Sequence, residues 1–527
     1  MLSVEIFVLL LALVAVIPLL ADKINIPYPT LLVVTGLGLC FIPGLPRFHL
    51  DPDLVLLFVL PPLIYRAAIT TSWRDFKENL RPILLLGVGL VVFTTLAVGI
   101  VVKLMLPTLP WAAAFVLGAI VSPSDTVAAI AIMQKLPVPR RVVTILEGES
   151  LINDATGLIA YKFATAAVLT GTFSLGHASA GFVWAVVGGV AVGLGVSWVI
   201  QNIQQRLDNP PVQSTISLVT PFLAYLPADL MGASGIISVV TVGVFLGWNS
   251  IDTITARVRL LVFPMWEMIE FVLNGFIFLA IGLQLPTVWH GLSGTPLPVL
   301  AKIAGAVCAA VTGVRILWVF PATYCPRLFS RSLARRDPYP PAKSVVLVAW
   351  IGMRGVVSLA AAMALPLDQD NGTPFPGRDL IIFLTFSVIL STLVLQGLSL
   401  APLVRWFKLQ REDDGRAREL VKAWRRAHES ALIRIEELAS QKKAPEDALA
   451  RARQRLEAQI ALSEDFETAQ AVESGRASAY SFVNRVEREI VQAQRREIVK
   501  LRNEGAVSFS VAREILRDLD LAEEKLH

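Results

Sequence analysis

Residues 147–161, EGESLINDATGLIAY, are the stretch around which the rest of the chain is interpreted. An apolar run begins here, yet two glutamates, Asn153 and Asp154 fall within eight positions. An ionised carboxylate near the centre of a bilayer costs roughly 2.5–3.5 kcal/mol on insertion scales. A chain keeps such groups where they bind something charged, so this stretch indicates a charged-ligand site inside a membrane.

The spacing of these polar residues puts them on two adjacent faces of a helix. At a helical 100° per residue, Glu147, Ser150 and Asp154 form one stripe. Glu149 and Asn153 lie one turn apart on the neighbouring face. In a helix that begins about twelve residues before it, Asp154 lies about 18 Å along the axis, a little past the middle of a ~30 Å hydrocarbon core. That depth suits a site reached from either side of the membrane in turn.

The composition divides the 527-residue chain into two parts. Hydrophobic residues make up 54% and charged residues only 17%, which excludes an ordinary soluble protein. Apolar runs fill residues 1–405, whereas residues 411–527 are rich in Arg, Glu, Lys and Ala. We therefore predict an all-α polytopic membrane domain over residues 1–408 and a helical tail over residues 409–527.

The charge and the cysteines narrow the function classes. The net charge of +5 arises mainly from predicted cytoplasmic loops, so no nucleic-acid surface is expected. The three cysteines stand singly in or beside apolar runs, which argues against a disulfide framework or a metal cluster. No cofactor is expected. The first apolar run lacks a basic start and a cleavage site, and is interpreted as a retained span.

The apolar runs predict about thirteen transmembrane helices, several of them short and several long enough to require tilts or breaks. Lys and Arg gather in the loops on the tail's side, while the opposite loops hold only Arg47 and Arg378, with Lys103 near a helix end. This alternation predicts a multi-pass protein of the cell (inner) membrane with an outside N-terminus and a cytoplasmic tail. The predicted spans are residues 2–21, 28–43, 53–71, 82–106, 111–134, 142–170, 180–204, 212–228, 234–249, 260–285, 296–324, 344–367 and 378–405.

Two spans carry signals for a broken helix. Pro123 removes a backbone donor and clashes with the preceding turn, so the fifth span is expected to kink or open beside Ser124 and Asp125. Gly352 and Gly355 weaken the twelfth span in the same way. Broken helices at membrane depth are tolerated where they line a cavity. A simple kink with a hydrogen-bonded Asp125 is the alternative.

Two arginines lie inside predicted spans. Arg315 is flanked by apolar residues and cannot easily reach the membrane surface, and Arg354 lies between the two glycines of the twelfth span. A buried cation needs a carboxylate or the carbonyl end of a helix. The available carboxylates are those of Asp125, Glu147, Glu149 and Asp154.

Five motifs in order along the chain resemble the monovalent cation/proton antiporter-1 family, which includes prokaryotic sodium/proton antiporters and eukaryotic sodium/proton exchangers. The resemblance covers about residues 1–405 and is strongest to the bacterial branch. The motifs are SPSD at 122–125, EGESLINDATGL at 147–158, LNGFIFLAIGLQLP at 273–286, VRILWVFP at 314–321 and GMRGVVSLAAAMALP at 352–366.

This resemblance implies a homodimer with two inverted six-helix repeats and two broken helices that cross at the midplane. The adjacent Asn153 and Asp154 match the family's signature for electroneutral exchange. Arg354 matches the arginine at the break of the second crossing helix, and Glu149 with Arg315 matches a buried ion pair. The implied ion-binding residues are Asp154, Asp125, Ser124, Ser150 and Asn153, with Na+ at Asp154 and Asp125.

The resemblance thus implies a secondary transporter, not an enzyme, that exchanges Na+ or Li+ for H+ by alternating access and serves pH homeostasis. Na+ and H+ would compete for Asp154, because a bound cation favours the ionised carboxylate. Exchange of K+ or of several cations remains the alternative, and an intramembrane hydrolase using Asp125 and Asp154 is a distant one. One departure is Arg66, because some relatives carry an acidic residue at the end of the third span. The tail is expected to regulate transport.

Overall fold

The computed structural model describes residues 4–41, 54–133, 138–284, 296–407 and 413–440, except residues 25, 208, 370 and 371, together with residue 136 and scattered residues from 445 to 519. Within these residues the fold is helical, with one isolated β-bridge between Asp368 and Pro374. Cα packing divides the chain into two units, Met1–Gln410 and Arg411–His527.

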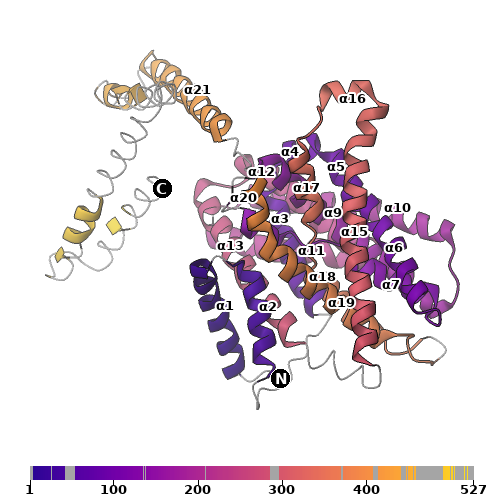
Figure 1. Ribbon diagram of the computed structural model, residues 1–527. Coiled ribbons are helices and arrows are strands. Elements are labelled where there is room, and N and C mark those ends of the chain that lie inside the picture. The colour runs from indigo at the N-terminus through magenta and orange to yellow at the C-terminus, as the bar shows by residue number, and fades with distance from the viewer. Residues whose placement is uncertain are drawn as a thin grey trace. The chain divides into compact units, whose positions relative to one another are not determined.

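The helices of the first unit are labelled in Figure 1. The first half of this unit contains α1 (Val4–Ile24), α2 (Tyr28–Leu39), η1 (Leu54–Val59), α3 (Leu60–Thr70), α4 (Trp73–Glu78), α5 (Leu80–Leu84), η2 (Leu85–Leu90), α6 (Val91–Met105), α7 (Trp111–Val121), α8 (Val127–Met133), α9 (Arg140–Thr170) and α10 (Leu175–Gln204). Two short π-helical turns, η1 and η2, lead directly into α3 and α6.

The second half of this unit includes several of the longest helices. It contains α11 (Pro210–Leu230), α12 (Gly235–Thr253), α13 (Ala256–Leu283), α15 (Leu297–Phe329), α16 (Arg331–Arg336), α17 (Ala342–Trp350), α18 (Val356–Met363), α19 (Arg378–Ser391), η3 (Thr392–Gln396) and α20 (Gly397–Phe407).

Helical spacing with mixed charges predicts tail helices at residues 416–440 and 446–470 and one or two more within 482–527. In the second unit, α21 (Asp413–Ser440) covers the first of these segments. Most of the other two segments lie outside the described residues.

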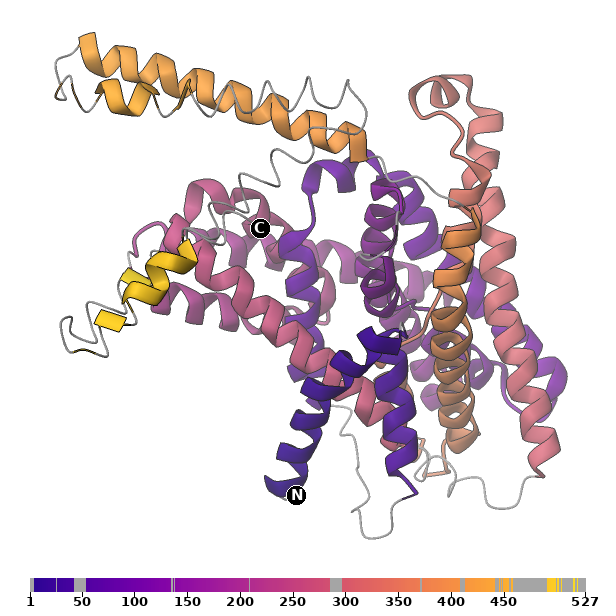
Figure 2. The same cartoon turned by 60° about the vertical axis from the view of Figure 1, so that its left-hand side comes forward.

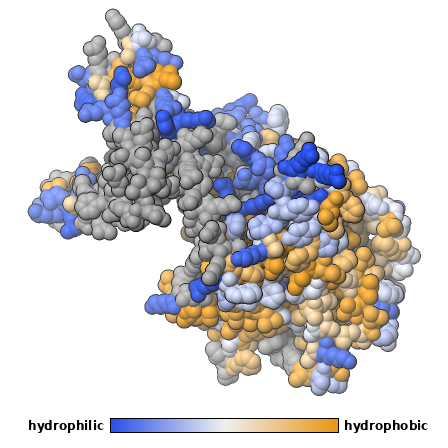
Figure 3. Space-filling model, turned by 45° about the horizontal axis from the view of Figure 1, so that its top comes forward, coloured by the Kyte–Doolittle hydropathy of each residue, from blue (hydrophilic) through white to orange (hydrophobic). Residues whose placement is uncertain are grey.

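Five helical segments among the described residues are long and apolar enough to cross a membrane. They cover Leu80–Met105, Leu175–Gln204, Ala256–Leu283, Leu297–Phe329 and Arg378–Phe407. Shorter apolar helices, such as α2 and α7, account for others of the predicted spans. Figure 3 shows apolar residues covering much of the visible face of the larger unit, and many large apolar side chains there are exposed, including Trp198 and Leu317. Such a surface suits contact with lipid.

Both predicted helix breaks are present. Residues 122–126 separate α7 from α8, and residues 351–355 separate α17 from α18. The two breaks touch, because the Asp125 backbone N–H donates to the Met353 carbonyl oxygen at 2.7 Å. Backbone groups that each helix leaves unpaired are therefore satisfied partly by the other.

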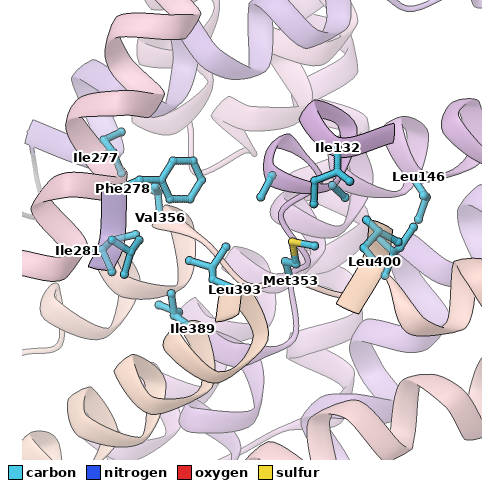
Figure 4. Packing of buried hydrophobic residues seen from close by; sticks show 14 of the residues in the cluster. Ile132, Leu146, Ile277, Phe278, Ile281, Met353, Val356, Ile389, Leu393 and Leu400 are labelled. Carbon is cyan, nitrogen blue, oxygen red and sulfur yellow. The ribbon is translucent and has the colours of Figure 1, made fainter. Parts of the chain in front are cut away.

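Buried side chains form three clusters that group the helices. One cluster joins α6, α7, α9, α15, α18 and α19, and a second joins α3, α9, α10, α11, α12 and α13. The third cluster runs between them: Figure 4 shows Ile277, Phe278 and Ile281 of α13 beside Val356 of α18. The α1 and α2 helices lie side by side (Figure 2) and add Leu10 and Leu32 to this third cluster. The two halves of the first broken helix therefore lie in different clusters, α7 in the first and α8 in the third.

A polar cluster at the ends of the membrane-spanning segments ties helix ends together around Asp337, which lies outside those segments. Its carboxylate accepts from Arg81 at 2.9 Å, from Arg141 at 2.7 Å and from Arg327 at 2.7 Å. Burial alone would raise the pKa of Asp337, but hydrogen bonds from Arg141 and Arg327 and their positive charges outweigh it and lower that pKa. These contacts join the beginnings of α5 and α9 to the end of α15.

Candidate functional site

A cavity of about 400 Å³ opens beside the crossing of the two breaks. Three residues of the predicted ion-binding set line it: Asp125, Ser150 and Asp154. Its lining residues come from α2, α3, α8, α9, α13 and α18. The remaining polar lining residues are Tyr28, Arg66, Thr70, Thr126, Glu147, Glu267, Glu270, Asn274 and Ser358.

The broken helix positions Asp125. Its Oδ1 accepts from the Val127 backbone N–H at 2.9 Å, which caps the beginning of α8. Gly355 of the second break lies against the other carboxylate oxygen, and a Cβ atom built on this glycine would overlap Asp125 Oδ2. Because residue 355 has no side chain, the Asp125 carboxylate can lie directly against the backbone of the second break.

Asp154 lies on α9 on the same side as Ser150, as the helical spacing predicted. Within the described residues, its carboxylate has no hydrogen-bond or ion-pair partner. Buried carboxylates are normally paired. Two carboxylates, Asp125 and Asp154, thus line one cavity, and no cationic side chain among the described residues is bound to either.

Glu149 faces the opposite way and forms a buried ion pair with Arg315. Two guanidinium nitrogens of Arg315 lie 2.5 and 2.8 Å from the two Glu149 carboxylate oxygens. Both side chains are at most 2% exposed. Arg315 Nε also donates to the Val348 carbonyl oxygen at 3.2 Å, so the pair anchors α9 and α15 to α17.

Ser124 and Asn153 extend this ion pair into a network. Ser124 Oγ donates to Glu149 Oε1 at 2.8 Å and accepts from Asn153 Nδ2 at 2.8 Å. The same Asn153 amide donates to the Ser124 carbonyl oxygen at 3.2 Å, and Ser150 Oγ donates to that oxygen at 3.4 Å. Neither Ser124 nor Asn153 lines the cavity. The predicted ion-binding set is thus divided into cavity residues and network residues.

Arg354, 1% exposed, stabilises the end of the first broken helix. Its Nε donates to the carbonyl oxygen of Val121, the last residue of α7, at 2.8 Å, and a second nitrogen donates to the Gly352 carbonyl oxygen. A cation at the carbonyl end of a helix complements the helix dipole. Arg354 is therefore held by backbone dipoles, one of the two options that the sequence left open.

Several cavity residues were not singled out as ligands from the sequence. Asn274 Nδ2 and Ser358 Oγ are buried and lack hydrogen-bond partners among the described residues. Asn274 is a candidate wall of the site from the sequence alone because it is polar within an apolar span, and Thr126 is a candidate cap beside the first break, whereas Ser358 carries no distinguishing signal. The hydroxyl and amide oxygens of these residues, together with the two carboxylates of Asp125 and Asp154, suit a hard cation better than a transition metal.

Residues 9–406 match the family described as sodium/hydrogen exchanger, transmembrane. The chain belongs to this family. It is a cation/proton antiporter, a transporter rather than an enzyme. The matched residues include both broken helices and the acidic cavity.

Individual relatives of this exchanger cover different shares of the chain. A protein of Mycobacterium tuberculosis named as an uncharacterized Na+/H+ exchanger is 34% identical over 99% of this chain and 96% of its own length. A sodium, potassium, lithium and rubidium/H+ antiporter of Bacillus subtilis is 33% identical over 74% of this chain and 60% of its own length. A Na+/H+ antiporter of Aphanothece halophytica is 34% identical over 72% of this chain and 69% of its own length.

The exchanger also shares its fold with a solved structure. The sodium proton antiporter MjNhaP1 of Methanocaldococcus jannaschii superposes with a TM-score of 0.60 at 21% identity, over 75% of this chain and 98% of that one. This likeness supports the helical architecture.

Proposed function

We propose that this exchanger moves one Na+ or Li+ across the membrane in one direction for each H+ that it moves in the other. This proposal rests on the Asp154 carboxylate, which lines the cavity and has no hydrogen-bond or ion-pair partner among the described residues. A bound cation favours its ionised form, and burial without a cation favours its protonated form. The two substrates therefore exclude one another at Asp154.

Asp125 and Ser150 complete the proposed binding site. Their oxygens line the same cavity as Asp154, and Na+ requires several oxygen ligands to replace its water. Ser124, Asn153 and the Glu149–Arg315 pair hold this part of α9 against the first break. In this proposal the network fixes the geometry, and the cavity residues bind the ion.

Alternating access follows from where the cavity lies. The cavity is lined by α2, α3 and α13 together with the two helix breaks and α9, so in this proposal a movement of one group of helices past the other closes one opening and forms another. Loading Asp154 with Na+ or H+ reduces the buried charge that such a movement must carry. The same proposal includes thirteen spans in inverted repeats, a homodimer in the inner membrane, an outside N-terminus and a cytoplasmic tail.

Exchange of K+, or of several monovalent cations, is the second candidate. The name of the Bacillus subtilis relative includes potassium and rubidium as well as sodium and lithium. A cavity of about 400 Å³ leaves room for a larger or partly hydrated ion. The described residues that line the cavity belong to the first unit, and on either candidate we propose a regulatory role for residues 409–527.

Purified protein in proteoliposomes that carry a pH-sensitive dye tests the activity. Adding Na+ or Li+ outside liposomes with an acidic lumen is expected to raise the luminal pH within seconds, whereas choline is expected to have no effect. A K+ response equal to the Na+ response would favour the second candidate. If no monovalent cation moves protons, the proposed function is wrong.

A membrane potential tests the one-for-one ratio. Such exchange transfers no net charge, so the Na+ gradient at which exchange stops is expected to be unchanged when valinomycin and K+ impose about 100 mV. Two protons per Na+ would couple about 2.3 kcal/mol per 100 mV, a shift of nearly fiftyfold in that gradient. A stopping point that moves with voltage would mean that a second carboxylate, with Asp125 the first to test, also carries a proton.

A further inference from the structure

Four charged side chains line the cavity in addition to Asp125 and Asp154. Arg66 lies on the last turns of α3, Glu147 on the second turn of α9, and Glu267 and Glu270 near the middle of α13. We call these four residues the cavity mouth. Three carboxylates and one guanidinium give the mouth a formal charge of −2.

Arg66 is paired at this mouth with Glu270. Its Nε lies 3.3 Å from Glu270 Oε2, and the two side chains are 18% and 34% exposed. This Nε makes no well-aligned hydrogen bond among the described residues, so the contact is an electrostatic ion pair and not a bidentate, hydrogen-bonded one. A guanidinium keeps its positive charge at any physiological pH. A permanent protein cation therefore stands beside Glu270 on the wall of the ion cavity.

We propose that Arg66 sets the affinity of the cavity for the transported monovalent cation. By pairing with the Glu270 carboxylate, the guanidinium neutralises its charge and weakens the attraction of the cavity for that cation. This inference rests on the proposed cation exchange. A cleft lined by charges of one sign concentrates ions of the opposite sign, and each added or removed charge changes that concentration. Arg66 thereby favours release of the cation on the side to which the mouth opens, at the expense of capture.

Charge arithmetic separates this role from a purely structural one. Replacing Arg66 by Gln makes the mouth −3, whereas replacing Glu270 by Gln makes it −1. The double replacement returns the mouth to −2, as in the wild type, and Arg66→Lys also leaves it at −2. An electrostatic role therefore predicts opposite effects of the two single changes and cancellation in the double variant. A structural pair predicts losses in both singles.

The test is the apparent KM for Na+ applied to the mouth side in oriented proteoliposomes, at one pH and low ionic strength. We expect a KM about threefold to tenfold lower for Arg66→Gln, and higher by a similar factor for Glu270→Gln. Arg66→Lys and the double variant are expected within about twofold of the wild type. Raising the ionic strength with choline chloride should shrink both shifts.

Arg74→Gln is the matched control, because Arg74 is 78% exposed, lies outside the cavity and precedes Glu78 by four residues on α4. Its KM should equal that of the wild type. If Arg66→Gln and Glu270→Gln both raise the KM, or neither changes it while the wild type still exchanges Na+ for H+, the affinity-setting role is wrong. A wild type that exchanges no cation would instead overturn the proposed function itself.

Discussion

Asp154→Asn is expected to abolish cation-driven proton movement while leaving the protein folded. A unit charge about 4 Å from a cation contributes roughly 4 kcal/mol at an effective dielectric constant near 20. Losing it corresponds to about a thousandfold in cation binding. The amide also cannot release a proton, so both substrates lose their shared ligand and the exchange rate should fall to that of empty liposomes.

The control for Asp154→Asn is Asp229→Asn, which removes a partly exposed carboxylate that pairs with Lys162 and does not line the cavity. That variant should exchange at the wild-type rate. The elution profile and melting temperature of Asp154→Asn in detergent should match the wild type, because no described residue pairs with this carboxylate. Exchange near the wild-type rate in Asp154→Asn would remove Asp154 from the site.

Local features of the fold could be predicted from the sequence because their causes are local. Pro123 removes a donor wherever it stands in a helix, and Gly352 and Gly355 weaken any helix that contains them. The side shared by Ser150 and Asp154 follows from the period of the helix alone. These rules identified the two breaks and the carboxylate that faces the cavity.

Pairings between distant residues could not be predicted in the same way. From the residues alone, four carboxylates were available to two buried arginines. The family resemblance implied Glu149 for Arg315, and the structure shows that pair and places backbone carbonyls at Arg354. Arg66 and Glu270 are 204 positions apart, so no local pattern links them.

Sorting Ser124 from Ser150 needed the structure too. Both hydroxyls lie near the break, but Ser124 turns toward Glu149 whereas Ser150 lines the cavity. The number of spans also stays a prediction, because breaks and π-helical turns divide several runs into pieces too short to identify singly.

The Glu149–Arg315 pair is expected to have the largest effect on stability. Removing one partner of a buried ion pair leaves an unpaired charge and costs roughly 3–5 kcal/mol. Arg315→Ala and Glu149→Gln should therefore each lower the melting temperature in detergent. Arg315→Ala should be the more severe, because it strands the Glu149 carboxylate and also removes the donor to the Val348 carbonyl.

The double variant decides whether the two side chains act as a pair. With both charges gone, neither is stranded, so the double variant should be less destabilised than the sum of the singles by about 2 kcal/mol or more. Lys162→Gln with Asp229→Asn is the matched exposed pair, whose side chains are 65% and 38% exposed. Its coupling should not exceed about 1 kcal/mol, because water screens both charges. Strict additivity at 149 and 315 would mean that these side chains do not meet in the folded exchanger, and the network through Ser124 and Asn153 would lose its anchor.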